Sequence, residues 1–430
     1  LVCKLLGGKV LKSTKREFGR AFVTKTITSK TPLFDGLFKD GTEEVWMSHG
    51  DGVSRMPKNF ISLAKSYNTD FAIIGDLKKK IFGIQFHPEV FHTKNGTLLF
   101  RNFLKISKIN ANWTPNKITE KLIRDLKLKI GKEKVLCALS GGVDSSVTAL
   151  LLRKAIGNNL TCIFVDNGLL RKDEAKDTIL LFKTHFKIKL IVINAKKLFL
   201  RNLKGISDPE KKRKLIGKLF IEVFEKQSEK LEGVKFLAQG TLYPDVIESI
   251  SVHGKSSHTI KSHHNVGGLP KKMNLKLVEP LRELFKDEVR KIGYTLGLDE
   301  QFIQRHPFPG PGLAIRCPEE ISKRKIDILR EVDHVFVKQL KKHKLYDKIW
   351  QALAIILPVK SVGVMGDSRT HEYACVLRAV NSTDGMTADF FYFNKDFLSE
   401  TSNRIINEIE GVNRVLFDIT SKPPGTIEWE

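Results

Sequence analysis

Seven consecutive residues, Ser140-Gly-Gly-Val-Asp-Ser-Ser146, constrain the fold of this chain more than any other stretch. They follow the apolar run Val135–Leu139, which predicts a buried strand, and they precede Val147–Arg153, which predicts a helix. A strand, a Gly/Ser turn and a helix in this order form an anion site, because the N–H groups and the dipole at a helix start favour negative charge. Gly141 and Gly142 carry no Cβ and so allow the backbone to approach an anion closely.

The polar side chains of this turn indicate a nucleotide. Ser140, Ser145 and Ser146 supply hydroxyl donors, and Asp144 suits a magnesium ion that bridges phosphates. The turn lacks the lysine of a Walker-type loop, so a different nucleotide chemistry is indicated. An ordinary Gly/Ser turn would be the alternative if only the two glycines were present.

The complete string resembles the pyrophosphate-binding loop of the N-type ATP pyrophosphatases, which cut ATP between the α- and β-phosphates and adenylate a substrate oxygen. The resemblance implies ATP as cosubstrate and Mg2+ as the metal, with Asp144 as its ligand. It implies contacts to ATP from Ser140, Gly141, Gly142, Val143, Asp144, Ser145 and Ser146. Val165 lies at the end of the next predicted strand, where doubly wound sheets border the adenine and ribose; an Asx-type turn after the strand is the alternative.

The order of predicted elements indicates an α/β fold with roughly two or three domains in 430 residues. Strand-like runs fill residues 1–112, and the Asn- and Pro-rich stretch near Trp113 predicts a linker. From 113 to 305 helices and strands alternate, which predicts a doubly wound parallel sheet. Residues 306–430 predict an α+β domain with a long helix over 320–344 and separate strands over 352–359 and 361–365.

Composition indicates the cellular location of the protein and the kinds of partner that it has. Five scattered cysteines without metal-ligand spacing indicate free thiols and a cytoplasmic location. No apolar run approaches the length of a membrane span, so we expect no membrane partner. The net charge of +25 comes from lysines spread along the chain, which favours solvated faces over a nucleic-acid surface. We therefore expect no nucleic-acid partner.

Two further motifs near the ends of the chain suggest chemistry. His87 and Glu89 stand two residues apart and point to one side in an extended chain, as a base and the carboxylate that orients it do. The stretch 305–316 is so dense in Pro and Gly that we expect a rigid non-helical loop, which would hold Arg316 for a phosphate or a carbonyl-rich ring. In the C-terminal stretch, Lys422 suits a phosphate and Glu428 suits the N–H groups of a purine.

Two segments leave more than one interpretation open. The basic stretch that includes Asp208, Glu210 and Lys212 opens a predicted helix; it suits a lid over a triphosphate, and a solvated helix start is the alternative. The loop 260–268 contains His263 and His264, and we favour a polar active-site loop over a zinc site there.

Taken together, these motifs resemble the GMP synthetase family over essentially the whole chain. The strings that carry the resemblance are 139–146, 241–249, 261–270, 279–293, 306–312, 363–367 and 422–430. It implies a class I glutamine amidotransferase part (1–112), an ATP pyrophosphatase domain (113–305) and a C-terminal domain (306–430) that forms a homodimer and binds XMP. It assigns His87 and Glu89 to the amidotransferase triad, Arg316, Asp367, Lys422 and Glu428 to XMP contact, and Asp208, Glu210 and Lys212 to the lid.

The resemblance also implies the reaction. The oxygen on C2 of XMP attacks the α-phosphate of ATP, pyrophosphate leaves, and ammonia then displaces AMP to give GMP. The triad cysteine of the family belongs to a Gly-x-Cys-Tyr-Gly elbow, and Leu1 aligns just after that elbow. We do not assign Cys3 as the nucleophile, and we expect either that the elbow lies outside this sequence or that the chain uses free ammonia in place of glutamine.

Two other functions remain open at this point. A tRNA-modifying ATP pyrophosphatase would share the loop and use the positive charge, but it would not need the 306–316 loop or the 422–430 stretch. A binding protein without catalysis is the second alternative, against which the intact 140–146 string argues.

Overall fold

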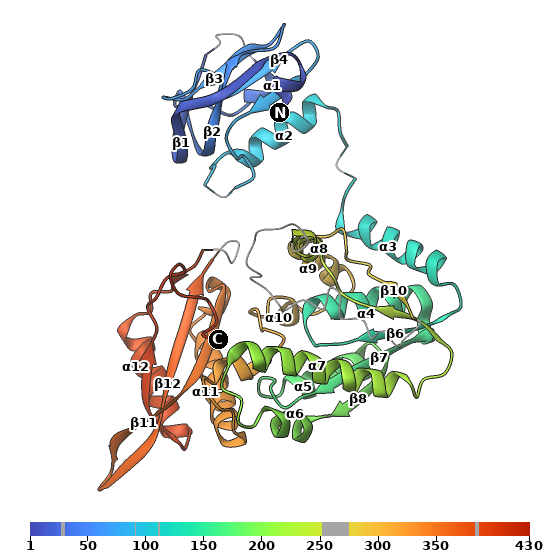
Figure 1. Ribbon diagram of the computed structural model, residues 1–430, viewed down its shortest axis with the longest axis vertical. Coiled ribbons are helices and arrows are strands. Elements are labelled where there is room, and N and C mark those ends of the chain that lie inside the picture. Colours follow the sequence, from blue (N-terminus) through green and yellow to red (C-terminus); the bar gives the residue numbers. More distant parts are fainter. Residues whose placement is uncertain (27–30, 91, 111, 252–274, 383–386) are drawn as a thin grey trace. The chain divides into compact units, whose positions relative to one another are not determined.

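The computed structural model describes residues 1–26, 31–90, 92–110, 112–251, 275–382 and 387–430. Over these ranges the chain divides into two compact units, Leu1–Asn112 and Trp113–Glu430 (Figure 1). The loop with His263 and His264 lies outside the described residues. The division into three domains expected from the sequence, with boundaries after residues 112 and 305, stays a prediction.

The first unit is built on a five-stranded antiparallel sheet with strand order β2-β1-β3-β4-β5. In β2, Val45 and Met47 are buried while their neighbours are more exposed, as expected of a sheet covered on one face. The unit contains α1 (Val2–Leu5), β1 (Lys9–Lys25), η1 (Pro32–Phe34), β2 (Thr42–Arg55), β3 (Ile61–Lys65), β4 (Ile73–Asp76), β5 (Ile81–Ile84) and α2 (Gly96–Ile106).

The second unit begins with a five-stranded parallel sheet of order β10-β9-β6-β7-β8, which confirms the predicted doubly wound α/β fold. Its elements up to Ile303 are α3 (Pro115–Ile130), β6 (Lys134–Ala138), α4 (Val143–Ile156), η2 (Gly157–Asn159), β7 (Leu160–Asp166), α5 (Glu174–Leu180), η3 (Leu181–His185), β8 (Lys189–Asn194), α6 (Lys196–Leu203), α7 (Pro209–Ser228), β9 (Val234–Ala238), α8 (Tyr243–Ser251), β10 (Lys276–Val278), α9 (Lys286–Thr295) and α10 (Glu300–Ile303).

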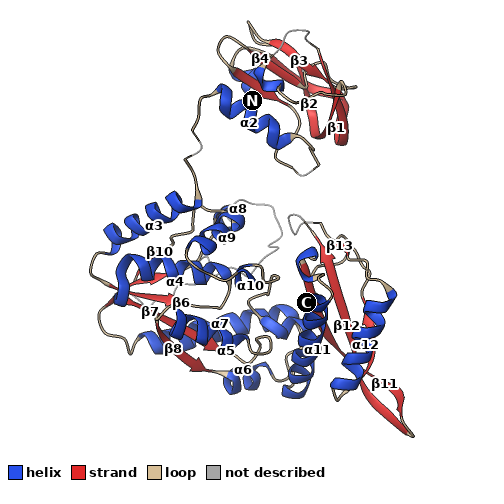
Figure 2. Ribbon diagram, turned by 180° about the vertical axis from the view of Figure 1, so that it is seen from behind, coloured by secondary structure: helices blue, strands red, loops and turns tan. Residues whose placement is uncertain are grey.

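Alternate residues of β6 face the two layers of helices. Val135 and Cys137 pack with α3, α4 and α9, whereas Leu136 packs with α6 and α7 on the opposite face. Figure 2 shows these layers from behind. A strand covered on both faces must be apolar throughout, which is why 135–139 is a continuous hydrophobic run.

The rest of the second unit is an α+β layer, as predicted. Strands β11, β12 and β13 form a sheet, β14 pairs with β12 in parallel, and α11 and α12 pack on the sheet. The core under α11 is continuous with the core under the parallel sheet. The elements are η4 (Gly312–Arg316), α11 (Lys323–Lys342), η5 (Tyr346–Lys348), β11 (Gln351–Met365), β12 (Ser368–Asn381), β13 (Asp389–Phe390), α12 (Lys395–Glu408) and β14 (Val412–Phe417).

Two expectations about this layer were wrong. The strands expected over 352–359 and 361–365 are one strand, β11, whose register with β12 shifts between Ile356 and Lys360. Pro358 lies in that irregularity, where its missing N–H is tolerated without ending the strand. The loop expected over 305–316 ends in the short 3-10 helix η4, because residues 313–316 contain neither Pro nor Gly.

Candidate functional site

The turn between β6 and α4, residues Ser140–Ser146, is here called the cradle. Gly141 has a φ of +85°, a left-handed conformation that favours glycine. Gly142 is the N-cap of α4 in an extended conformation, and no side chain of the described residues caps the helix there. The N–H groups of the first turn of α4, from Val143 onward, are therefore available to an anion.

The serines of the cradle differ in where their hydroxyls point. Ser140 Oγ and Ser145 Oγ lie 2.9 Å apart, and Ser145 Oγ also accepts from the Ser140 N–H at 3.2 Å. Ser146 is fully buried and donates to the Gly142 carbonyl at 2.7 Å. The first two hydroxyls thus stiffen the turn at its open side, and that of Ser146 is directed inward; contact with ATP stays a prediction for all three.

Close backbone packing explains two glycines around the cradle. A Cβ on Gly141 would lie 3.1 Å from Thr178 Oγ1. A Cβ on Gly240, just beyond β9, would lie 3.0 Å from the carbonyl carbon of Asp144. The end of β9 therefore lies directly against the start of α4 and fixes where α4 begins.

Asp144 faces a cation that the sequence analysis did not identify. Lys286 Nζ, at the start of α9, donates to Asp144 Oδ2 across the open side of the cradle. The lysine side chain is 48% exposed, so solvent screens this ion pair and it contributes little to stability. Lys286 and Asp144 are 142 residues apart, and no local pattern links them.

The groups at Asp144 fit a Mg2+ ion that takes some of its ligands from phosphate oxygens. Asp144 Oδ1 is buried and has no hydrogen-bond partner among the described residues, so it is free to coordinate a cation. The described residues contain no group of three or more His, Cys, Asp or Glu side chains suited to a metal. A single carboxylate is what a Mg2+ site needs when phosphate oxygens and water supply the other ligands.

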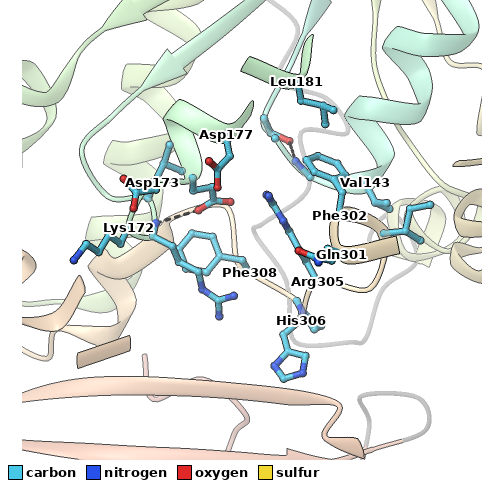
Figure 3. Close-up of a pocket in the computed structure, with 18 of the residues that line it drawn as sticks. Val143, Lys172, Asp173, Asp177, Leu181, Gln301, Phe302, Arg305, His306 and Phe308 are labelled. Atoms are coloured by element: carbon cyan, nitrogen blue, oxygen red, sulfur yellow. Dashed lines mark hydrogen bonds between the residues drawn. The ribbon is translucent and has the colours of Figure 1, made fainter. Parts of the chain in front are cut away.

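The cradle opens into a cavity of about 1730 Å³ in the second unit. Val165 is 7% exposed and lines the cavity from the last residues of β7, as the cradle does from the end of β6. Figure 3 shows Lys172, Asp173 and Asp177 opposite Val143, Gln301 and Phe302, with Arg305 between them. The walls carry charges of both signs. Eight are basic side chains: Arg171, Lys172, Lys176, Lys286, Arg290, Arg305, Lys338 and Lys341. Six are carboxylates: Asp144, Asp173, Glu174, Asp177, Asp299 and Asp333.

Arg316 is fully buried at the end of η4 and holds the C-terminal stretch of the chain. Its Nε and Nη2 donate to Glu428 at 3.0 and 2.8 Å, and its Nη1 donates to Asp333 at 3.3 Å. Gln351 Nε2 also donates to Glu428, at 2.6 Å. Burial works to lower the pKa of Arg316, but the two carboxylates outweigh it and raise this pKa above its usual value. We call one set of charged and polar side chains the C-terminal network: Arg171, Arg316, Asp333, Gln351 and Glu428.

His306 fixes the loop before η4 to β11. Its Nδ1 accepts from the Ala352 N–H at 3.1 Å, its Nε2 lies 2.9 Å from the Tyr346 carbonyl, and its ring stacks on Tyr346 at 3.8 Å. This arrangement requires the neutral ring with its proton on Nε2. Burial lowers the pKa of His306 to about 4, so the ring is neutral at physiological pH.

The structure brings together only part of the set predicted to contact XMP. Arg316 and Glu428 are bonded, and the backbone of Lys422 pairs with Ala388, the residue before β13. Asp367 is exposed in the turn between β11 and β12, and Figures 1 and 2 place that turn at the far end of the sheet from the C-terminal stretch. Contact with XMP stays a prediction for all four, and a direct contact from Arg316 is not supported by its complete burial.

The predicted lid residues form the start of a fixed helix. Asp208 is the N-cap of α7 and accepts from the Lys211 N–H at 2.7 Å, and Glu210 pairs with Lys214 on the surface. Lys212 is fully buried and donates to the Cys317 carbonyl at 2.8 Å and to the Glu430 carboxylate. The cavity lining does not include these residues, and the lid role remains a prediction that their contacts do not favour.

In the first unit, His87 and Glu89 lie together as predicted. His87 Nδ1 and Glu89 Oε1 are 2.7 Å apart, and both side chains are exposed. Partial burial works to raise the pKa of Glu89, but hydrogen bonds from its own N–H and from His87 outweigh it and lower this pKa. The pair has the geometry of a base and its orienting carboxylate, and its catalytic role stays a prediction.

Cys3, the one cysteine of residues 1–112, lies elsewhere in the first unit. It belongs to α1, is 5% exposed, packs with Phe60 and Ile74, and donates its thiol to the Arg55 carbonyl at 3.4 Å. A buried thiol with a backbone partner is not set up as a nucleophile. This placement agrees with leaving Cys3 out of the triad.

Comparison with known proteins covers most of the chain. Three family models match: glutamine amidotransferase class-I over residues 1–106, NAD synthase over 116–215, and the GMP synthase C terminal domain over 338–429. The GMP synthase [glutamine-hydrolyzing] of Bartonella henselae is 58% identical over 100% of this chain and 83% of its own length. The chain belongs to the GMP synthase family. The enzyme of the same name from Bradyrhizobium diazoefficiens is 58% identical over 99% of this chain and 77% of its own length.

Membership in the GMP synthase family confirms the fold and the enzyme class expected from the sequence. The chain is an ATP-using ligase of purine biosynthesis that aminates XMP to GMP. The two alternatives, a tRNA-modifying enzyme and a binding protein without catalysis, are thereby set aside. Within the described residues, no helix has the length and apolar character needed to cross a membrane.

Proposed function

We propose that the cradle binds the β- and γ-phosphates of ATP and stabilises them as they leave as pyrophosphate. The observation that carries this proposal is the uncapped start of α4, whose N–H groups face the cavity. Negative charge grows on the leaving group as the bond to the α-phosphorus breaks, and fixed N–H dipoles stabilise it without reorganisation.

Lys286 and Asp144 share the charge of the phosphates in this proposal. Asp144 would hold Mg2+ through its free Oδ1, and the ion would supply positive charge to screen the triphosphate. Lys286, which pairs with Asp144 in the structure, supplies a second positive charge at the open side of the cradle. Val165 borders the adenosine part of ATP at the end of β7.

XMP lies where the cavity approaches the C-terminal stretch, and Glu428, which does not itself line the cavity, accepts from N–H groups of its purine. Arg316 acts on XMP through Glu428, since Arg316 itself is buried. The C2 oxygen of XMP attacks the α-phosphorus and pyrophosphate departs; ammonia then adds to C2, and AMP leaves with that oxygen. The cavity walls keep water from the adenylated intermediate.

Glutamine is the source of ammonia in this proposal, with His87 as the base and Glu89 as its orienting carboxylate in the amidotransferase part of the chain. We place the enzyme in the cytoplasm, where the five free cysteines would stay reduced. We also propose a homodimer through the C-terminal sheet. Val362 and Val364 are 61% and 74% exposed on β11, and a partner subunit covering them would account for an XMP contact by Asp367 that one chain alone does not make. Sedimentation analysis of the full chain tests the dimer.

A label experiment tests the reaction. XMP carrying heavy oxygen at C2 is incubated with ATP, magnesium and ammonium, which bypasses glutamine hydrolysis. We expect GMP, pyrophosphate and AMP whose phosphate carries the label. Unlabelled AMP would exclude an adenylated XMP.

A further inference from the structure

Phe308 lies between two arginines in the loop that precedes η4. The guanidinium carbons of Arg171 and Arg316 are each 4.9 Å from the centroid of its ring. A ring face attracts a cation, and one ring between two guanidinium groups holds both at fixed positions. Such a placement brings two positive charges close together, so it needs a negative group beside them.

Asp333 is that negative group. It projects from α11 with its side chain 3% exposed, and its two oxygens bind different arginines. Oδ2 lies 3.2 Å from Arg171 Nε, and Oδ1 accepts from Arg316 Nη1 at 3.3 Å. A carboxylate has just the two oxygens that this bridge requires, and burial makes each contact stronger than it would be in water.

The two arginines lead in opposite directions from Asp333. Arg171 lines the nucleotide cavity, and its Nη2 also donates to the Ala352 carbonyl at 3.4 Å. Arg316 holds Glu428 with two hydrogen bonds. Contacts therefore run without a break from the wall of the ATP cavity to the carboxylate that we assign to XMP.

We propose that Asp333 is a positioning residue that couples the binding of ATP to the binding of XMP through Arg171, Arg316 and Glu428. The inference rests on the proposed role of Glu428 in XMP recognition. The phosphates of ATP neutralise the positive charge of the cavity wall and hold the Arg171 side chain in one position. Arg171 then holds Asp333, Asp333 holds Arg316, and Arg316 keeps Glu428 in the position that binds XMP. Each substrate then raises the affinity for the other by the same factor.

The test replaces Asp333 by Asn, which keeps the shape of the side chain and removes the charge. The dissociation constant of XMP is measured with and without α,β-methylene ATP, an analogue that cannot release pyrophosphate. We expect the analogue to tighten XMP binding roughly tenfold in the unchanged protein and to have almost no effect in Asp333→Asn. The proposal is overturned if the analogue does not tighten XMP binding in the unchanged protein, or if it tightens XMP binding in Asp333→Asn as well.

A second variant keeps the proposal testable if Asp333→Asn does not fold. Arg171→Lys retains the charge but loses the planar fork that meets both Asp333 and Phe308, at a side chain that is 15% exposed. We expect it to weaken XMP binding as well as ATP binding, although Arg171 does not touch Glu428. A change in ATP affinity alone would contradict the inference.

Glu331→Gln is the matched control. Glu331 also projects from α11 and pairs with Lys172, the neighbour of Arg171, at 2.6 Å, but its side chain is 43% exposed and it lies outside the C-terminal network. We expect normal coupling in this variant. Glu428→Gln separates the two proposals: if it leaves XMP binding unchanged, the assigned XMP site is wrong, whereas weaker binding together with intact coupling in Asp333→Asn refutes only the role of Asp333.

Discussion

The cradle and the C-terminal network serve the two nucleotides of one reaction, but they are assembled differently. The cradle consists of consecutive residues, and its donors are backbone groups at the start of α4. The C-terminal network joins side chains from Arg171 to Glu428, and its central members, Arg316 and Asp333, are buried. The first depends on local backbone geometry, and the second depends on the packing of several elements around charges that cannot be separated without cost.

This difference predicts how each region responds to change. Alterations at the residues of the cradle that line the cavity, 140–144, should act on the chemical step and leave the fold intact, because these groups face the cavity. Alterations in the C-terminal network should act on stability and XMP binding together, because the same buried contacts support both.

The largest effect should come from Asp144→Asn in the cradle. The amide cannot neutralise Mg2+, and it no longer balances Lys286, so kcat should fall about a thousandfold. The thermal midpoint should stay close to that of the unchanged protein, because the side chain is partly exposed. Stopped-flow or discontinuous assay of AMP release, with a melting curve on the same sample, measures both quantities. A clearly lower thermal midpoint in this variant would contradict the view that the cradle acts on the chemical step and not on the fold.

Acid should destabilise the region around the C-terminal network through His306. The pKa of this ring is about 4 in the folded chain and near its usual value in the unfolded chain, so the unfolded state binds the proton first. The stabilising contribution is complete above the unfolded pKa and is lost as pH falls toward 4. The loss should reach on the order of 3 kcal/mol.

Urea titrations at a series of pH values measure this loss. His306→Gln, whose side chain does not titrate, should reduce the slope of unfolding free energy against pH in that window. An unaltered slope would show that other groups control the acid response.

Arg316→Lys should give the smallest of the three effects. Lysine keeps the buried charge but cannot bind Glu428 with two donors while reaching Asp333, so the free energy of unfolding should fall by about 2 kcal/mol. KM for XMP should rise while kcat changes little, because Glu428 is held less firmly. Steady-state kinetics and urea unfolding check the pair of results. Loss of stability with an unchanged KM would separate the network from XMP binding.

Much of the fold could be predicted because its signals are local. The continuous apolar run before the cradle indicates a strand covered on both faces, and the alternation of helices and strands indicates a parallel sheet. The sequence was less informative where neighbouring elements decided the outcome. The sequence predicted two strands over 352–359 and 361–365, but pairing with β12 carries β11 through both as one strand with a shift in register.

The sequence by itself determined the cradle, because a Gly-Gly turn between a strand and a helix forms an anion site from its own backbone. It also indicated the pairing of His87 with Glu89, although the structure forms this pair across a turn after β5 and not in the extended segment that we expected. Only the tertiary structure decided that Lys286 faces Asp144, that Arg316 is buried on Glu428, and that Asp333 joins two arginines around Phe308. These contacts join residues far apart in the chain. The packing of helices and sheets decides which charges meet there, and a local sequence pattern does not show that packing.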